Sequence, residues 1–232
     1  MIVQAAAWME TDYRVKNVRY GKSVEFIRTD FGEPLLEGKQ IPTDQPNSTG
    51  LYKEEVAQLE KIGSKMEIVQ EFFKGYDMAE LNDKDVTAQF ECIRIFRRMI
   101  GNIDNYMSFQ GCLLVKEFLE RQHNFEGLNI GLKPQGAAGL DFDERTVDGK
   151  RVIGELKTTY PYLSNDLGAN HKGTFLHDFE KLNQNEADMK YFFVTEERAF
   201  TIVKLKYSQY LQNIILVLLP QAMIDSEYVV SY

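Results

Sequence analysis

The spacing of apolar residues along the chain changes near residue 50, where a helical period begins, and near residue 128, where short apolar runs replace it. Before residue 50, the segment 13–27 alternates apolar and polar positions around Gly21, which predicts a β-hairpin. Glycine and proline residues then indicate a loop or linker up to about residue 50. Farther along, apolar residues recur every three or four positions. That period predicts helices over 51–73, 85–103 and 108–122.

From residue 128 onward, short apolar runs replace the helical spacing. Strands are expected over 128–132, 140–146, 150–159, 191–195 and 214–219, with helices over 175–182 and 199–210. Strands joined first by tight turns and later by helices predict a mixed β-sheet flanked by helices, which is an α/β (α+β) fold class. The predicted domains are a hairpin and mainly helical region over 1–107 and a sheet-containing core over 108–232.

The turn Val147-Asp148-Gly149 fixes the pairing of the two strands that flank it. A three-residue hairpin loop with glycine in the left-handed position places Asp141 opposite Glu155. Because side chains alternate between the two faces of a sheet, one face then carries Asp141, Asp143, Glu155 and Lys157. A two-residue loop would instead turn Glu155 away from Asp141.

Two carboxylates held opposite one another repel unless a cation lies between them. Oxygen ligands favour a hard ion, so the pair Asp141 and Glu155 predicts a Mg²⁺ site. Lys157 lies two residues farther along the same face, within reach of a phosphate at that ion. A metal ion that polarises a phosphoryl oxygen, together with a lysine that offsets developing charge, is suited to phosphodiester hydrolysis.

Asp141, a strand turn and then Glu155-Leu156-Lys157 resemble the signature of the PD-(D/E)xK nuclease superfamily. The resemblance covers about residues 108–219, and the segment 154–159 is most similar to type II restriction endonucleases. It implies a restriction-endonuclease-like core in which Asp141 and Glu155 bind Mg²⁺ with the Leu156 carbonyl. It also implies that Lys157 is the catalytic lysine and that cleavage leaves a 5′-phosphate and a 3′-hydroxyl.

One departure from the signature is that Leu140, not proline, precedes Asp141, which leaves Asp143 as a competing first acid. The short pattern acid-x-Lys also occurs at Glu37-Gly-Lys39 and Asp188-Met-Lys190. Only Glu155 and Lys157 lie within a predicted strand that follows an acidic strand in matching register. A solvated hairpin face is the alternative explanation of this pattern.

Further residues are weaker candidates for the same site. The preceding helix can supply an accessory polar residue to the site, and the candidates are Gln110, Glu117 and Glu120. A small-residue loop and a polar loop beside the predicted site supply candidate DNA contacts, namely Gln135, Gly136, Thr159, Asn165, Asn170 and Lys172. Turn formation and ordinary solvation explain these residues as well.

The composition excludes several classes of protein. The chain has 232 residues, of which 44% are hydrophobic and 27% charged, which is globular rather than disordered or collagen-like. No apolar run reaches the ~20 residues that a membrane helix needs. Cys92 and Cys112 form no disulfide framework or zinc motif, and the three histidines form no metal cluster. Without a phosphate-binding glycine loop, no nucleotide cofactor is expected.

The sequence therefore predicts a cytoplasmic, Mg²⁺-dependent endonuclease of double-stranded DNA, of the type II restriction class. Cutting both strands of a symmetric site favours a homodimer, with residues 1–107 supplying DNA contacts or the dimer surface. The alternatives are another nuclease of this superfamily in repair, recombination or phage DNA processing, and a non-catalytic binding protein on the same fold. The net charge of −8 argues against a general coat for nucleic acid, although DNA binding needs positive potential only along one cleft.

Overall fold

The computed structural model describes residues 13–16, 25–28, 45–74, 86–133 and 138–232. The chain separates into two units, Met1–Ile103 and Asp104–Tyr232. In the first unit, strands β1 (Tyr13–Lys16) and β2 (Glu25–Arg28) pair antiparallel, as the predicted hairpin requires. Helices α2 (Lys53–Lys74) and α3 (Val86–Ile100) follow. They pack through an apolar cluster made of Ile68, Phe72, Cys92, Ile95 and Met99.

The second unit contains a five-stranded sheet that begins after helix α4 (Ile103–Gln122). Its strands lie in chain order from one edge to the other. The two inner pairings, β4 with β5 and β5 with β6, are parallel, and both outer pairings are antiparallel. This confirms the predicted mixed sheet. The strands are β3 (Phe142–Arg145), β4 (Arg151–Lys157), β5 (Met189–Val194), β6 (Ile215–Leu218) and β7 (Val229–Ser231).

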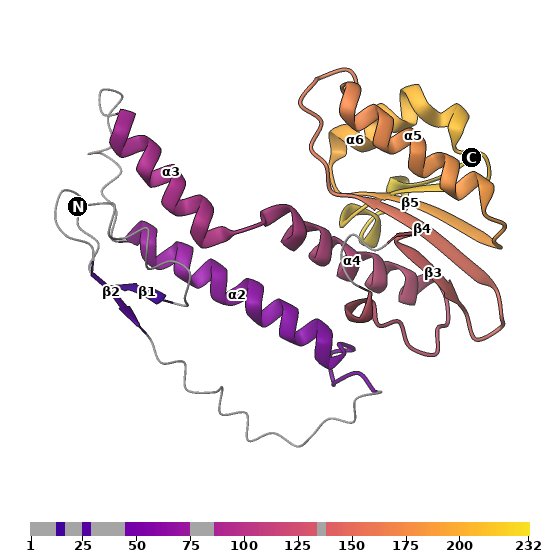
Figure 1. The fold of residues 1–232 in the computed structure, drawn as a ribbon. Coiled ribbons are helices and arrows are strands. Elements are labelled where there is room, and N and C mark those ends of the chain that lie inside the picture. The colour runs from indigo at the N-terminus through magenta and orange to yellow at the C-terminus, as the bar shows by residue number, and fades with distance from the viewer. Residues whose placement is uncertain (1–12, 17–24, 29–44, 75–85, 134–137) are drawn as a thin grey trace. The chain divides into compact units, whose positions relative to one another are not determined.

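Helices cover both faces of the sheet (Figure 1). Helix α4 packs on one face, while α5 (Ala169–Gln184) and α6 (Glu197–Ile202) pack on the other. Within β4, Val152 and Leu156 belong to the α4 side, whereas Ile153 belongs to the α5 side. Because side chains alternate along a strand, Glu155 and Lys157 lie on the α5 face together with Ile153.

The expected strand over 128–132 is wrong. Ile130–Leu132 forms a 3₁₀ helix, which the Asn129 side chain caps by accepting a hydrogen bond from the Gly131 N–H at 3.0 Å. An asparagine that bonds its own downstream backbone favours a turn over a strand. Two strands rather than three therefore separate α4 from α5.

The C-terminal part of the chain contains an element that the pattern did not predict. Strand β7 pairs with β6, and its three residues are too few to show a period. The helix expected over 199–210 is present as α6, a π-helical segment (Val203–Tyr207) and a 3₁₀ turn (Ser208–Tyr210). Across the described residues, we find no helix with the length and apolar character needed to span a membrane.

Candidate active site

The turn between β3 and β4 has the predicted three-residue form. Thr146 donates its backbone N–H to Lys150 at 2.9 Å, and Gly149 adopts a φ of +83°. The register pairs Phe142 with Gly154 and runs without a slip to the turn. Extending it by one step places Asp141 opposite Glu155, which confirms the pairing on which the predicted site depends.

Asp141 lies where β3 begins and reaches across to the backbone of β4. Its Oδ2 accepts a hydrogen bond from the Leu156 N–H at 2.9 Å. The Lys157 carbonyl accepts from Thr195 N–H, next to β5, at 3.1 Å. Successive carbonyls alternate between the two edges of a strand, so the Leu156 carbonyl points to the opposite edge, towards Asp141.

Glu155 is the most deeply buried acid of the site, with 2% of the residue exposed. Burial and the negative charge of Asp141 raise the pKa of its carboxyl to about 8, although the ammonium of Lys181 opposes this rise. Asp141 and Glu155 both line a pocket of about 330 Å³ whose walls also include Lys157. The two acids and the lysine of the predicted motif are thus brought together.

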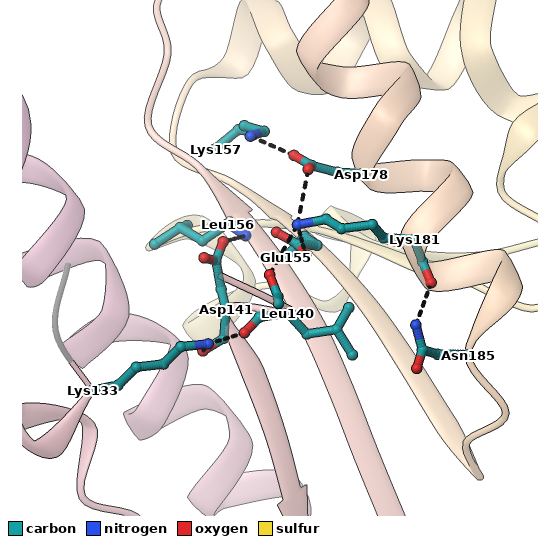
Figure 2. Close-up of polar contacts among 10 residues, drawn as sticks. Lys133, Leu140, Asp141, Glu155, Leu156, Lys157, Asp178, Lys181 and Asn185 are labelled. Carbon is teal, nitrogen blue, oxygen red and sulfur yellow. Dashed lines mark hydrogen bonds and ion pairs between the residues drawn. The ribbon is translucent and has the colours of Figure 1, made fainter. Parts of the chain in front are cut away.

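Helix α5 completes the site with two residues that the motif did not include, Asp178 and Lys181 (Figure 2). The Lys181 Nζ lies 2.6 Å from Glu155 Oε1 and 3.3 Å from Asp178 Oδ1. The other oxygen of Asp178 forms an ion pair with the Lys157 ammonium. Acids and lysines therefore alternate in a chain of ion pairs from Glu155 to Lys157, in which Asp178 fixes where the Lys157 ammonium lies.

The segment that leads into β3 is held by two lysines. Lys133 contacts the Leu140 carbonyl, and its Nζ also lies 3.5 Å from the Asp141 carbonyl oxygen. Lys181 donates to the Gly139 carbonyl at 3.0 Å. These contacts fix the backbone on which Asp141 stands, so its carboxylate approaches β4 from a defined direction.

The structure places Asp143, the competing first acid, outside this cluster. Both of its oxygens bind the Arg151 guanidinium, at 2.8 and 2.7 Å, and these hydrogen bonds lower the pKa of the carboxyl. Asp143 does not line the pocket, whereas Asp141 does. We therefore take Asp141 as the first acid of the site.

The accessory candidates on α4 do not reach the pocket. Glu117 forms an exposed ion pair with Arg121, and Gln110 is exposed elsewhere on the helix. Glu120 is exposed and does not line the pocket either. The helix instead contributes Cys112, whose thiol pKa is raised to about 12 by burial and by the charge of Asp141. A thiol that stays protonated forms a neutral wall rather than a nucleophile.

Four of the six candidate DNA contacts lie within the described residues. Thr159 is half-buried just after β4, and Lys172 is exposed near the start of α5. Asn165 and Asn170 are exposed in the same region, while Gln135 and Gly136 lie outside the described residues.

Of the two rival acid-x-Lys matches, the one at Asp188 lies within the described residues and has a structural role. Asp188 accepts a hydrogen bond from the Arg151 N–H at 2.8 Å and so links β4 to the start of β5. Glu37 and Lys39 lie outside the described residues.

The donor set of the pocket suits a hard cation. In the described part of the chain, no three or more His, Cys, Asp or Glu side chains are grouped so as to hold a metal ion. The donors that the signature assigns to a metal ion are the carboxylates of Asp141 and Glu155 and the Leu156 carbonyl, all of them oxygen ligands of the kind that Mg²⁺ prefers. Comparisons with protein-family models, curated proteins and solved structures found no match for this chain.

Removing the Lys181 ammonium is expected to destabilise the metal-free protein. A Lys181→Met variant leaves buried Glu155 without the cation that lies 2.6 Å away, and leaving a buried polar group without its partner costs about 1–3 kcal/mol. Thermal unfolding without metal measures the loss, and addition of Mg²⁺ should recover more stability in the variant than in the wild type. Lys190→Met in β5, outside the pocket, serves as the matched control.

Proposed function

We propose that this protein is a Mg²⁺-dependent DNA endonuclease of the PD-(D/E)xK type, and that it cuts double-stranded DNA as type II restriction enzymes do. The observation that carries the proposal is the convergence of Asp141, Glu155, the Leu156 carbonyl and Lys157 at one pocket. Two acids, a backbone carbonyl and a lysine at the ends of paired strands are the set that the sequence signature requires.

Each residue has a distinct role in this proposal. Asp141, Glu155 and the Leu156 carbonyl hold Mg²⁺, which when bound polarises the phosphoryl oxygens and neutralises their developing charge. Lys157 binds and orients the attacking water and offsets negative charge on the phosphate. Its ion pair with Asp178 keeps the ammonium at the pocket wall. A new bond forms between the water oxygen and phosphorus as the water loses a proton to solvent. The bond from phosphorus to the 3′-oxygen breaks, and that oxygen takes a proton from solvent, which leaves a 5′-phosphate and a 3′-hydroxyl.

The fold is compatible with this chemistry. A mixed five-stranded sheet with helices on both faces suits the restriction-endonuclease-like core proposed for residues 108–232. We further propose that residues 1–107 contribute DNA contacts or a dimer surface, because cutting both strands of a symmetric site needs two active sites.

Incubation of the protein with plasmid and phage DNA tests the proposal. Discrete fragments that appear with Mg²⁺ and disappear with EDTA are expected. A metal-dependent smear would keep the nuclease but favour its role in repair, recombination or phage DNA processing. Intact DNA in the presence of Mg²⁺, over a range of pH and salt, would contradict the proposal.

A further inference from the structure

The loop between β4 and α5 exposes large aromatic side chains next to the candidate active site. Tyr162 is 83% exposed and Tyr160 is 49% exposed, and the adjacent Leu163 is 54% exposed. Exposed aromatic rings close together offer faces on which the ring of a ligand can stack. These residues have no role in the hydrolysis described above.

Neighbouring residues hold the aromatic rings in place. The rings of Tyr162 and His171 stack with centroids 5.9 Å apart and an angle of 27°, and Tyr160 packs edge-on against Tyr162 at 6.4 Å. Arg198 lies 5.0 Å from the centre of the Tyr160 ring and donates to the Pro161 carbonyl at 3.1 Å. Tyr160, Tyr162 and His171 thus form an aromatic platform that is in place before any ligand arrives.

The aromatic platform lies within a short reach of the catalytic lysine. Tyr160 follows Lys157 by three residues and Tyr162 by five. A fully extended chain spans at most about 3.6 Å per residue, so these positions lie no more than about 11 and 18 Å from Lys157 along the backbone. This distance is short enough for one DNA strand to contact Lys157 with a phosphate and the platform with a base a few nucleotides away.

The charge around the platform suits a polyanion. Arg198 and Lys172 carry positive charge, and among the described residues neither forms an ion pair with a carboxylate. The acid of the loop, Asp166, is already engaged by the Tyr207 hydroxyl at 2.6 Å and by Lys206 at 3.7 Å. Phosphates can therefore approach without meeting an unpaired carboxylate in the loop.

We infer that the aromatic platform stacks unpaired bases beside the scissile phosphate, and that the protein binds duplex DNA carrying a single-stranded flap or overhang next to the cut more tightly than it binds an intact duplex. Aromatic side chains bind unpaired bases through their faces, whereas the bases of an intact duplex are stacked on one another and present only their edges. The inference rests on the proposed nuclease function, because that function places the phosphate at Lys157, and it adds a preference among double-stranded DNA substrates.

Binding to matched oligonucleotides tests the inference. We compare a blunt duplex with the same duplex carrying a four-nucleotide flap that contains 2-aminopurine, in Mg²⁺ and with the Lys157→Ala protein to prevent cutting. Tighter binding of the flapped DNA and quenching of 2-aminopurine fluorescence are expected. Tyr162→Ala should weaken binding of the flapped DNA about 5- to 150-fold and abolish the quenching. Tyr162→Phe, which keeps the ring, and Tyr232→Ala, at an exposed tyrosine elsewhere, should preserve both.

The outcomes separate this inference from the nuclease proposal. The proposed role of the aromatic platform would be wrong if the protein bound blunt and flapped DNA with equal affinity, or if Tyr162→Ala lost the same affinity for both. Neither result would contradict Mg²⁺-dependent cleavage. Binding and quenching by the flapped DNA, with no cleavage of any substrate by the wild type, would support the platform and overturn the nuclease.

Discussion

A Lys157→Ala protein is expected to cleave DNA about 10²- to 10³-fold more slowly than the wild type, the loss typical of removing one positioned electrostatic group. The Lys157 ammonium pairs with Asp178 at the wall of the pocket that Asp141 and Glu155 also line. Its removal therefore takes away a positive charge at the wall of the pocket where the water and phosphate are proposed to bind. Initial rates on a plasmid at saturating Mg²⁺ measure the effect, and thermal unfolding confirms that the variant is folded.

Two further variants make this test specific. Lys150→Ala removes an exposed lysine of the same hairpin, which pairs with Asp148 in the turn, and should leave the cleavage rate within about twofold. Asp178→Asn keeps the shape of the partner but removes its charge, so the rate should fall less than in Lys157→Ala. If Lys157→Ala cuts as fast as Lys150→Ala, the assignment of the catalytic lysine is wrong.

The hairpin that carries Asp141 and Glu155 could be predicted because it depends on local rules. Asp148-Gly149 identifies the turn, and once the loop has three residues the two-residue period of a strand sets the register for several residues in both directions. The structure decides between the three-residue loop and the two-residue alternative. The choice between Asp141 and Asp143 could not be made in this way, because both lie on the same face. The Arg151 side chain decides it by binding Asp143.

Asp178 and Lys181 were missed because their place in the site depends on tertiary packing. They follow Glu155 by more than twenty residues, and no sequence spacing shows which turn of α5 covers β4. One signal was available. Asp178 lies on the apolar stripe of Phe175, Phe179 and Leu182, where a buried carboxylate needs a charged partner.

Neutralising Glu155 is expected to strengthen metal-free DNA binding, most clearly above pH 8. Burial and the charge of Asp141 raise the Glu155 pKa to about 8, against Lys181, so the carboxyl is mostly protonated at pH 7 and charged at pH 9. In the unfolded chain, the pKa of a glutamate is about 4.3. The stability that the folded protein has below the unfolded pKa is therefore lost progressively as the pH rises from about 4.3 to about 8, because over this interval the folded state holds a proton that the unfolded state has released.

The same titration adds a negative charge beside the phosphates of bound DNA. Metal-free wild-type protein should thus bind DNA about tenfold more weakly at pH 9 than at pH 7 and recover its affinity with Mg²⁺. Glu155→Gln should bind DNA without metal at both pH values, and its affinity should change little when Mg²⁺ is added. Its unfolding temperature should change less between pH 7 and 9 than that of the wild type.

Fluorescence anisotropy at low salt, in the Lys157→Ala background, measures the binding of DNA. The control is Glu186→Gln, which changes an exposed acid outside the pocket. If the metal-free protein at pH 9 binds DNA as tightly as the protein with Mg²⁺, then Glu155 does not repel the DNA. A metal ion at this pocket would in that case have no negative charge to neutralise for DNA binding.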